Sequence, residues 1–205
     1  MGIYQDQILP RAQNRVMGVE RLREARGRVC EGLEGAVLEI GFGTGLNAYY
    51  YTPKITKLVA IEPSKVCMKI AEPRIAKAPV PVQYGGLTGE HLDLPSGEFD
   101  AALSTWTLCT IPNMDAALAE VRRVLKPGGV FHFIEHGHAP DASVARWQAR
   151  IEPPWKHVAG GCHITRRIPE AIERAGFEIQ KLDTYYYKGE PKPMGYTYEG
   201  RAVSR

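Results

Sequence analysis

The chain has 205 residues, 44% hydrophobic and 24% charged, which suits one folded domain with a sizeable core. Lys and Arg number 26 against 23 Asp and Glu, and the resulting formal charge of +3 is spread along the chain. This balance argues against a dedicated nucleic-acid or membrane-surface binder, which needs concentrated positive charge. The composition also excludes a disordered chain, a coiled coil and a collagen-like fibre.

The four cysteines are isolated in sequence, and no two form a C-x-x-C pair: they are Cys30, Cys67, Cys109 and Cys162. This spacing suits a reducing compartment better than a disulfide framework or structural zinc. The first residues lack the apolar core of a signal peptide, and no stretch approaches about 18 apolar residues. We therefore expect a cytoplasmic protein without an integral membrane segment, and the sequence leaves its oligomeric state open.

Apolar runs alternate with helical patterns along most of the chain. The predicted strands are 36–40, 58–61, 80–82, 99–103 and 130–134. The predicted helices are one or two within 11–34, a stretch after Gly45, one from an N-cap at Ser64 towards Ala78, and 115–125, which ends at Lys126-Pro-Gly-Gly129. Strands that alternate with helices across short loops predict a mostly parallel sheet covered on both faces.

The end of the chain departs from this alternation. Residues 177–187 and 196–204 are two β-like runs separated by a loop rich in Pro and Gly. They predict an antiparallel hairpin at the edge of the sheet. The expected fold is thus a single domain over 1–205, a doubly wound α/β sheet, with residues 1–34 as a helical cap over the active site.

A glycine-rich loop follows the first predicted strand, in the segment Glu39-Ile-Gly41-Phe-Gly43-Thr-Gly45. Glycines let the backbone turn sharply and approach a ligand closely. A dinucleotide fingerprint needs Gly or Ala at the sixth position from the first glycine, and Leu46 stands there. An acid at Glu39 is also unfavourable beside a pyrophosphate but suits an ammonium, such as that of S-adenosylmethionine. These two departures disfavour a nicotinamide oxidoreductase.

Glu62 ends the second predicted strand, where an acid can accept hydrogen bonds from ribose hydroxyls. The acid before the loop, the loop, this second acid and the helix-Pro-Gly-Gly-strand pattern together indicate a ligand site rather than chance turns.

Four segments resemble the successive motifs of class I S-adenosylmethionine-dependent methyltransferases: VLEIGFGTGLN, VAIEPS, FDAALSTWTLCTIPN and LKPGGVFHFIEHG. They are similar to the branch that contains the ubiquinone and menaquinone methyltransferases. The segment RWQARIEPPWKHVAGGCHITRRIPEAIERAGF most closely resembles the small alkyl-thiol methyltransferases. The resemblance implies a seven-stranded Rossmann-like sheet and S-adenosylmethionine as cofactor.

The resemblance also implies residue roles around that cofactor. Gly41, Phe42, Gly43 and Gly45 would wrap its methionine part beside Glu39, and Glu62 would hold the ribose. Pro63 and Ser64 would flank the adenosine, Thr88 and Gly89 would meet the adenine edge, and Ser104, Thr105 and Trp106 would face the methyl-bearing sulfonium. Thr88 stands where the family usually has an aspartate.

Methyl transfer needs positioned reactants, and the acceptor decides how much acid–base help is required. A thiol is already partly ionised, whereas a carbon or hydroxyl acceptor needs a firmly placed base. The candidate catalytic residues are Glu135 and His136 at the end of the fifth strand, and His163 in a glycine-flanked loop. Cys109 reads as a small buried hydrophobe, because the acceptor itself is the nucleophile.

A metal site among the histidines and Cys162 is not predicted, because their spacing matches no standard ligand pattern. Trp106, Trp155 and the segment at Tyr4 are candidate walls of an apolar acceptor pocket, with residues 5–15 as a flap over it. The predicted function is methylation of a small lipophilic acceptor, a thiol first. A phospholipid-amine or quinone methyltransferase and a non-catalytic S-adenosylmethionine sensor are the alternatives.

Overall fold

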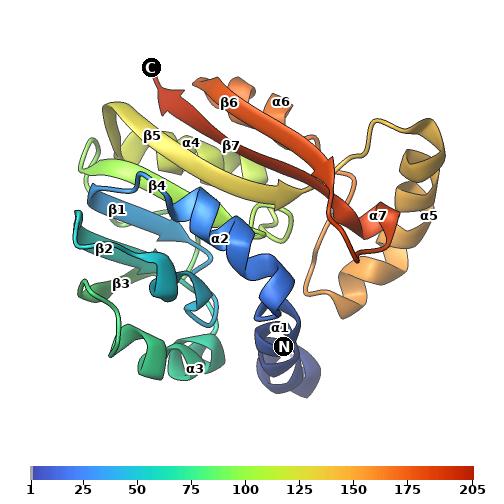
Figure 1. Ribbon diagram of the computed structural model, residues 1–205, viewed down its shortest axis with the longest axis horizontal. Helices are drawn as coiled ribbons and strands as arrows, with labels where there is room; N and C mark the ends of the chain where they lie inside the picture. Colours follow the sequence, from blue (N-terminus) through green and yellow to red (C-terminus); the bar gives the residue numbers. More distant parts are fainter. Residues whose placement is uncertain (1) are drawn as a thin grey trace.

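The computed structural model describes residues 2–205, and it builds one seven-stranded sheet in the order β3-β2-β1-β4-β5-β7-β6 (Figure 1). The strands are β1 (Gly35–Ile40), β2 (Ile55–Ile61), β3 (Val82–Gly86), β4 (Phe99–Thr105), β5 (Leu125–His136), β6 (Phe177–Tyr186) and β7 (Tyr196–Ser204). Strands β1 to β5 pair in parallel, whereas β7 runs antiparallel to both β5 and β6. The predicted doubly wound sheet with an antiparallel hairpin at its C-terminal edge is confirmed.

Helical segments occupy most of the connections. They are η1 (Tyr4–Ile8), α1 (Leu9–Met17), η2 (Glu20–Leu22), α2 (Arg23–Cys30), η3 (Leu46–Tyr50), α3 (Lys65–Ile75), α4 (Met114–Val124), α5 (Ala142–Val158), α6 (Ile168–Arg174) and α7 (Lys192–Gly195). The predicted N-cap of α3 is confirmed, since the Ser64 side chain accepts a hydrogen bond from the Cys67 N–H at 3.2 Å.

Three element boundaries differ from the sequence expectation. The stretch after Gly45 is only a short 3-10 helix, because β2 already begins at Ile55 and leaves little more than one turn. Strand β3 begins after Pro81 rather than before it, since proline cannot donate to the ladder. Strand β5 starts at Leu125, opposite Phe99, and a bulge takes up the Pro-Gly-Gly turn before pairing resumes at Val130.

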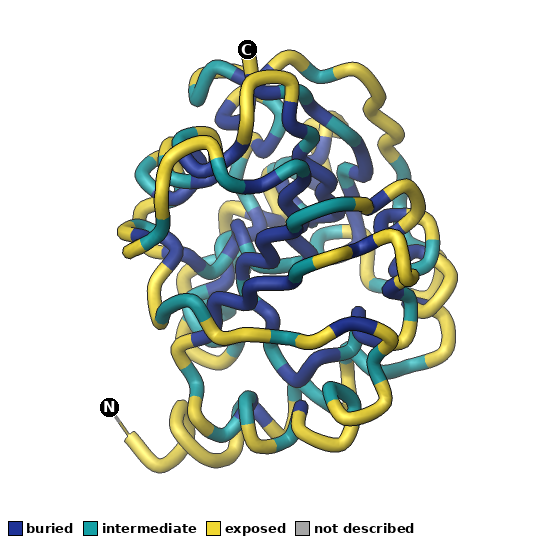
Figure 2. The backbone as a smooth tube through the Cα atoms, turned by 90° about the vertical axis from the view of Figure 1, so that its left-hand side faces the viewer, coloured by how far each residue is buried: buried dark blue, intermediate teal, exposed yellow. Residues whose placement is uncertain are grey.

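The core has one part on each face of the sheet. Helices α4 and α6 pack Leu118, Val121 and Ile172 against the face that carries Phe131 and Phe133. Helices α2 and α3 and the η3 turn cover the opposite face. The strands between them run buried through the middle of the molecule (Figure 2). Each fully buried large apolar side chain contributes about 1.5–3 kcal/mol, so these two layers fix the sheet that carries the loops described below.

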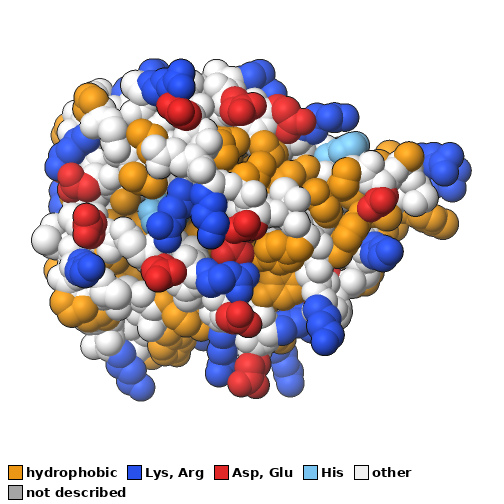
Figure 3. All heavy atoms as spheres, turned by 45° about the horizontal axis from the view of Figure 1, so that its top comes forward, with side chains coloured by type: hydrophobic (Ala, Val, Ile, Leu, Met, Phe, Trp, Pro, Cys, Tyr) orange, Lys and Arg blue, Asp and Glu red, His pale blue; other side chains and the backbone are white. Residues whose placement is uncertain are grey.

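Helices α1 and α5 lie beside the edge at which the parallel strands end (Figure 1). The Tyr4 hydroxyl donates to the carbonyl of Val158 at 2.7 Å, which joins the N-terminal segment to the end of α5. Positive and negative side chains are interspersed on the face seen in Figure 3. Across residues 2–205, no helix combines the length and the apolar character needed to cross a membrane.

Candidate active site

The glycine-rich loop turns back on itself directly after β1. Gly41, Gly43 and Gly45 have φ angles of +70°, +57° and +74°, in the left-handed region that favours glycine. A Cβ at Gly41 would overlap the Thr107 side chain, so that position admits no larger residue. At Gly43 the nearest atom to a Cβ would be a backbone oxygen 3.8 Å away, which leaves this side of the loop open for a ligand to approach the backbone.

Glu62 ties the end of β2 to this loop. One of its carboxylate oxygens accepts from the Gly43 N–H at 2.7 Å, and the other accepts from the Ser64 N–H at 2.8 Å. Burial raises the pKa of Glu62, while these two hydrogen bonds act against that shift. Each oxygen has a second lone pair, so the carboxylate can still accept from a hydroxyl. Pro63 beside it is exposed.

Glu39 lies beneath the loop with its carboxylate fully buried. One oxygen accepts from the Asn47 side-chain amide at 2.8 Å, and the other accepts from the Tyr51 hydroxyl. Burial raises the pKa of Glu39 to about 7. Glu39 therefore holds the η3 turn in place, and its predicted contact with an ammonium stays a proposal.

Arg26 of α2 completes this buried network from above. Its guanidinium donates to the Asn47 side-chain oxygen at 2.7 Å and lies 4.9 Å from the centre of the Trp106 ring. The Asn47 amide also donates to the Thr105 hydroxyl at 3.0 Å, so the ends of β1 and β4 share one set of hydrogen bonds. Desolvation lowers the pKa of Arg26, while the Glu39 carboxylate opposes that shift.

Trp106 follows β4 with a φ of +51°, the one positive value among the non-glycine residues from 2 to 205. A bulky residue in this region is a conformational outlier, and such outliers cluster at ligand sites. Ser104, by contrast, is fully buried and points away to Glu135. Thr88 lies exposed in the loop after β3, and Gly89 is packed close to Ile40 and Ile111.

Glu135, a predicted catalytic residue, is fully buried at the end of β5. One of its oxygens accepts from the Ser104 hydroxyl at 2.7 Å and from the N–H groups of Thr107 and Leu108 at 2.9 and 3.1 Å. The other oxygen is buried and has no hydrogen-bond partner in the described part of the chain. Burial raises the pKa of Glu135. This carboxylate therefore holds the loop after β4.

His136, the next residue, lies between two sulfurs. Its Nε2 atom is 3.1 Å from Cys109 Sγ and 3.0 Å from Cys162 Sγ. Hydrogen bonds from Cys109 and His136 lower the pKa of Cys162 to about 4, although burial acts in the opposite direction. The pKa of His136 is raised: burial alone would lower it, but the contact with Cys162 and the charges of Glu135 and Glu190 together outweigh burial. We call these three residues the sulfur–imidazole cluster.

His163, the third predicted catalytic residue, faces α5. Its Nδ1 atom lies 3.0 Å from a carboxylate oxygen of Glu152. The other Glu152 oxygen accepts from the backbone N–H and the hydroxyl of Thr165 at 2.7 and 2.6 Å. The backbone N–H of His163 also donates to the carbonyl of Cys109 at 2.9 Å. His163 thus anchors the loop that brings Cys162 to the cluster.

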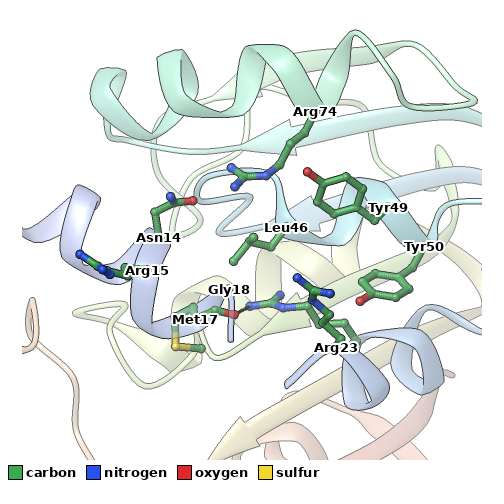
Figure 4. Close-up of a pocket in the computed structure, with 10 residues that line it drawn as sticks. Asn14, Arg15, Met17, Gly18, Arg23, Leu46, Tyr49, Tyr50 and Arg74 are labelled. Carbon is green, nitrogen blue, oxygen red and sulfur yellow. Dashed lines mark hydrogen bonds between the residues drawn. The ribbon is translucent and has the colours of Figure 1, made fainter. Parts of the chain in front are cut away.

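A pocket of about 480 Å³ opens beside the glycine-rich loop, between α1, α2, η3 and α3 (Figure 4). It is lined by Asn14, Arg15, Met17, Gly18, Arg23, Arg26, Leu46, Tyr49, Tyr50 and Arg74. The residues predicted to form the acceptor pocket are absent from this lining: Tyr4, Trp106 and Trp155. The pocket is therefore not the predicted acceptor pocket. Four arginines among its walls make it a cationic chamber next to the loop.

Sequence reasoning missed several residues of this site. Arg26 and Tyr51 stand in no recognised motif, and Asn47 ends the motif VLEIGFGTGLN without a predicted role, so only the buried network reveals what these residues do. Cys109 and Cys162 are far apart in sequence and each resembles an ordinary core cysteine. A buried acid at Glu39 was the available signal, because such a group requires hydrogen-bond donors around it.

A parallel sheet with a glycine loop after β1 and an acid after β2 defines the class of α/β proteins that bind nucleotide-like ligands at the carboxyl ends of their strands. A family model described as a methyltransferase domain matches residues 38–133. The chain is 35% identical to thiol S-methyltransferase TMT1B from Rattus norvegicus over 175 residues, which are 83% of this chain and 71% of that protein. It therefore belongs to the S-adenosylmethionine-dependent methyltransferase family.

Two further comparisons agree with this assignment. Demethylmenaquinone methyltransferase from Thermobifida fusca is 29% identical over 154 residues, covering 69% of this chain and 64% of that protein. A solved structure from Thermotoga maritima, titled an S-adenosylmethionine-dependent methyltransferase and possible histamine N-methyltransferase, superimposes with a TM-score of 0.69 at 23% identity and covers 99% of both chains. At that identity, the second likeness shows the fold.

Proposed function

We propose that this protein transfers the methyl group of S-adenosylmethionine to the sulfur of a small lipophilic thiol. The similarity to proteins named thiol S-methyltransferases supports the acceptor class. The residues at the carboxyl edge of the sheet support it independently, because they offer apolar surroundings and no carboxylate that is free to act as a base.

The observation that supports a thiol acceptor is that the carboxylates at the carboxyl edge of the sheet are already engaged in hydrogen bonds. Glu39, Glu62 and Glu135 are all buried, and each already accepts hydrogen bonds that hold a loop. A hydroxyl or carbon acceptor needs a placed base to remove its proton. A thiol with a pKa of about 8.5 ionises with little help. His136, which ends β5, lies between two sulfurs, and His163 is paired with Glu152.

The residues present fit the methyl donor. The open side of Gly43 admits close approach to the backbone, and Glu62 has lone pairs left for ribose hydroxyls. When bound, S-adenosylmethionine supplies an electrophilic methyl group on a sulfonium. Gly41, Phe42 and Gly45 shape the loop around it. Glu39 holds the η3 turn, and Ser104 holds Glu135. The further proposed contacts of the donor are Pro63, Ser64, Thr88, Gly89, Thr105 and Trp106.

Apolar side chains suit a lipophilic acceptor near the sulfur–imidazole cluster. Ile151, Trp155 and Ile164 pack around Cys109 and Cys162. Excluding water from such a site strengthens the electrostatic interactions inside it and keeps the reactants together. The N-terminal segment, which contacts α5 through Tyr4, is placed to complete the enclosure.

The test is a matched acceptor series: thiophenol, phenol and aniline with purified protein and S-adenosylmethionine. We expect S-adenosylhomocysteine and the methyl thioether from thiophenol, well above the rate without enzyme, and little product from the other two. Turnover of phenol or aniline with none of thiophenol would overturn the thiol assignment in favour of a hydroxyl or amine acceptor. Donor binding without turnover of any acceptor, including quinols and phospholipid amines, would indicate a non-catalytic S-adenosylmethionine sensor.

A further inference from the structure

The sulfur–imidazole cluster has the composition of a metal site. Cys109 Sγ, Cys162 Sγ and a ring nitrogen of His136 all lie within 4.8 Å of one another. They come from three separate places in the fold: the loop after β4, the end of β5 and the loop after α5. Two thiolates and one imidazole form a ligand set of zinc enzymes that keep their fourth coordination position open.

We propose that Cys109, His136 and Cys162 bind one Zn²⁺ ion, and that the fourth position receives the sulfur of the acceptor thiol. The thiol part of this inference rests on the proposed function, and the metal part does not. Soft sulfur ligands with imidazole select zinc over magnesium or calcium. Cys109 and Cys162 are 1% and 4% exposed, so few water molecules compete for the site.

The backbone prepares the two cysteines for this role. The His163 N–H donates to the Cys109 carbonyl at 2.9 Å and thereby holds the two cysteine loops side by side. Glu152 fixes the same loop through Thr165. The N–S separations of 3.0 and 3.1 Å are slightly shorter than the roughly 3.5 Å expected around a tetrahedral zinc ion, so binding needs an expansion of about half an ångström.

The position of the cluster connects it to methyl transfer. Cys109 Sγ lies 3.8 Å from the carbonyl oxygen of Trp106, the residue held at a positive φ after β4. In coordination, the S–H bond of the acceptor breaks, its proton goes to bulk water, and the thiolate sulfur donates an electron pair to the metal. In methylation the acceptor sulfur would form its bond to the methyl carbon while the sulfonium C–S bond of the donor breaks and S-adenosylhomocysteine leaves. The acceptor sulfur is then a neutral thioether, a weaker ligand that dissociates.

Metal binding is tested first, without any reference to activity. Protein purified under reducing conditions without chelator is titrated with Zn²⁺ and, in parallel, with Co²⁺, and its metal content is measured. We expect one equivalent per chain and thiolate-to-cobalt absorption, both lost in Cys109→Ser and Cys162→Ser. Cys67→Ser, which changes a buried cysteine outside the cluster, is the matched control and should bind like the unchanged chain. Less than a tenth of an equivalent in the folded, reduced protein overturns the inference.

Acceptor binding is tested second, on the cobalt-loaded protein. Thiophenol should change the cobalt spectrum, whereas phenol should not, and chelation should lower thiol turnover at least tenfold with recovery on adding Zn²⁺. If cobalt binds but its spectrum does not change with thiophenol, only the claim that the acceptor sulfur takes the fourth position is overturned. Unchanged thiol turnover in metal-free protein overturns the inference but leaves the proposed function standing. Formation of a Cys109–Cys162 disulfide with no metal uptake would overturn it in favour of a redox pair.

Discussion

The proposed donor half and the proposed acceptor half of the site are built in different ways. On the donor side, the loop Gly41–Gly45 and Glu62 follow neighbouring strands and offer mainly backbone and one carboxylate. On the acceptor side, Cys109, His136 and Cys162 meet from three distant segments and offer side chains. A short motif can therefore encode the donor side, while the acceptor side exists only once the chain has folded. This difference suits a family in which the donor is constant and the acceptor varies.

The largest expected effect is on the donor side, in Gly43→Val. A β-branched residue at a φ of +57° costs about 1–2 kcal/mol of strain, and its side chain fills the open side of the loop. We expect the affinity for S-adenosylmethionine, measured by calorimetry, to fall at least a hundredfold.

Gly97→Val is the matched control for that change. Gly97 has a φ of +66° with no atom within 4 Å of a Cβ, and it precedes β4 at the opposite edge of the sheet. The strain is similar, but donor affinity should stay within twofold. Equal losses of affinity in both variants would show that strain, and not occupation of the loop, was measured.

The next largest effect is the pH dependence of stability that Glu39 introduces. Its pKa is about 7 in the folded protein and near 4.5 when unfolded, so the folded state binds the extra proton between these values. Stability from this group is full below about pH 4.5 and is lost as pH rises towards 7, by about 3 kcal/mol at most.

Glu39→Gln removes this titration while keeping an acceptor and a donor for Asn47 and Tyr51. Urea unfolding at pH 5 and pH 7 should therefore show a smaller decline in the free energy of unfolding for the variant than for the unchanged chain. An identical decline in both proteins would mean that Glu39 does not carry the extra proton.

The sequence predicted the doubly wound, mostly parallel sheet, the C-terminal hairpin and the glycine-rich loop because each depends on local signals. Apolar runs mark strands, and three glycines at left-handed φ angles mark the turn. It predicted Glu135 and His136 as catalytic from their place at the carboxyl edge, and His163 from its glycine-flanked loop. It could not say where each side chain points. In the structure, Glu135 accepts hydrogen bonds from the N–H groups of Thr107 and Leu108, and His163 contacts Glu152. The spacing of residues in the sequence does not indicate these contacts.

A smaller effect is expected on the acceptor side at Glu135, if this carboxylate positions the loop rather than acting as a base. Glu135→Gln keeps an oxygen for Ser104 and the two backbone N–H groups, so thiol turnover should stay within about tenfold and its pH profile should not move. Loss of a general base commonly costs 10²–10⁴ in rate. A loss of that size together with a shifted profile would make Glu135 catalytic after all.

The smallest effect is expected where the N-terminal segment meets the loop that carries Cys162. Leu9 on α1 lies against Gly160, close enough that a Cβ on the glycine would be 2.8 Å from Leu9 Cδ2. Leu9→Ala should loosen this contact and raise the KM for the thiol a few-fold, with donor affinity unchanged, because the glycine-rich loop is built from other residues. Val16→Ala on the same helix, 57% exposed, is the control for lost helical side-chain volume. If both variants leave KM unchanged, the segment does not cover the acceptor; if Leu9→Ala weakens donor binding instead, α1 belongs to the donor half, through the arginine-lined pocket whose wall it forms.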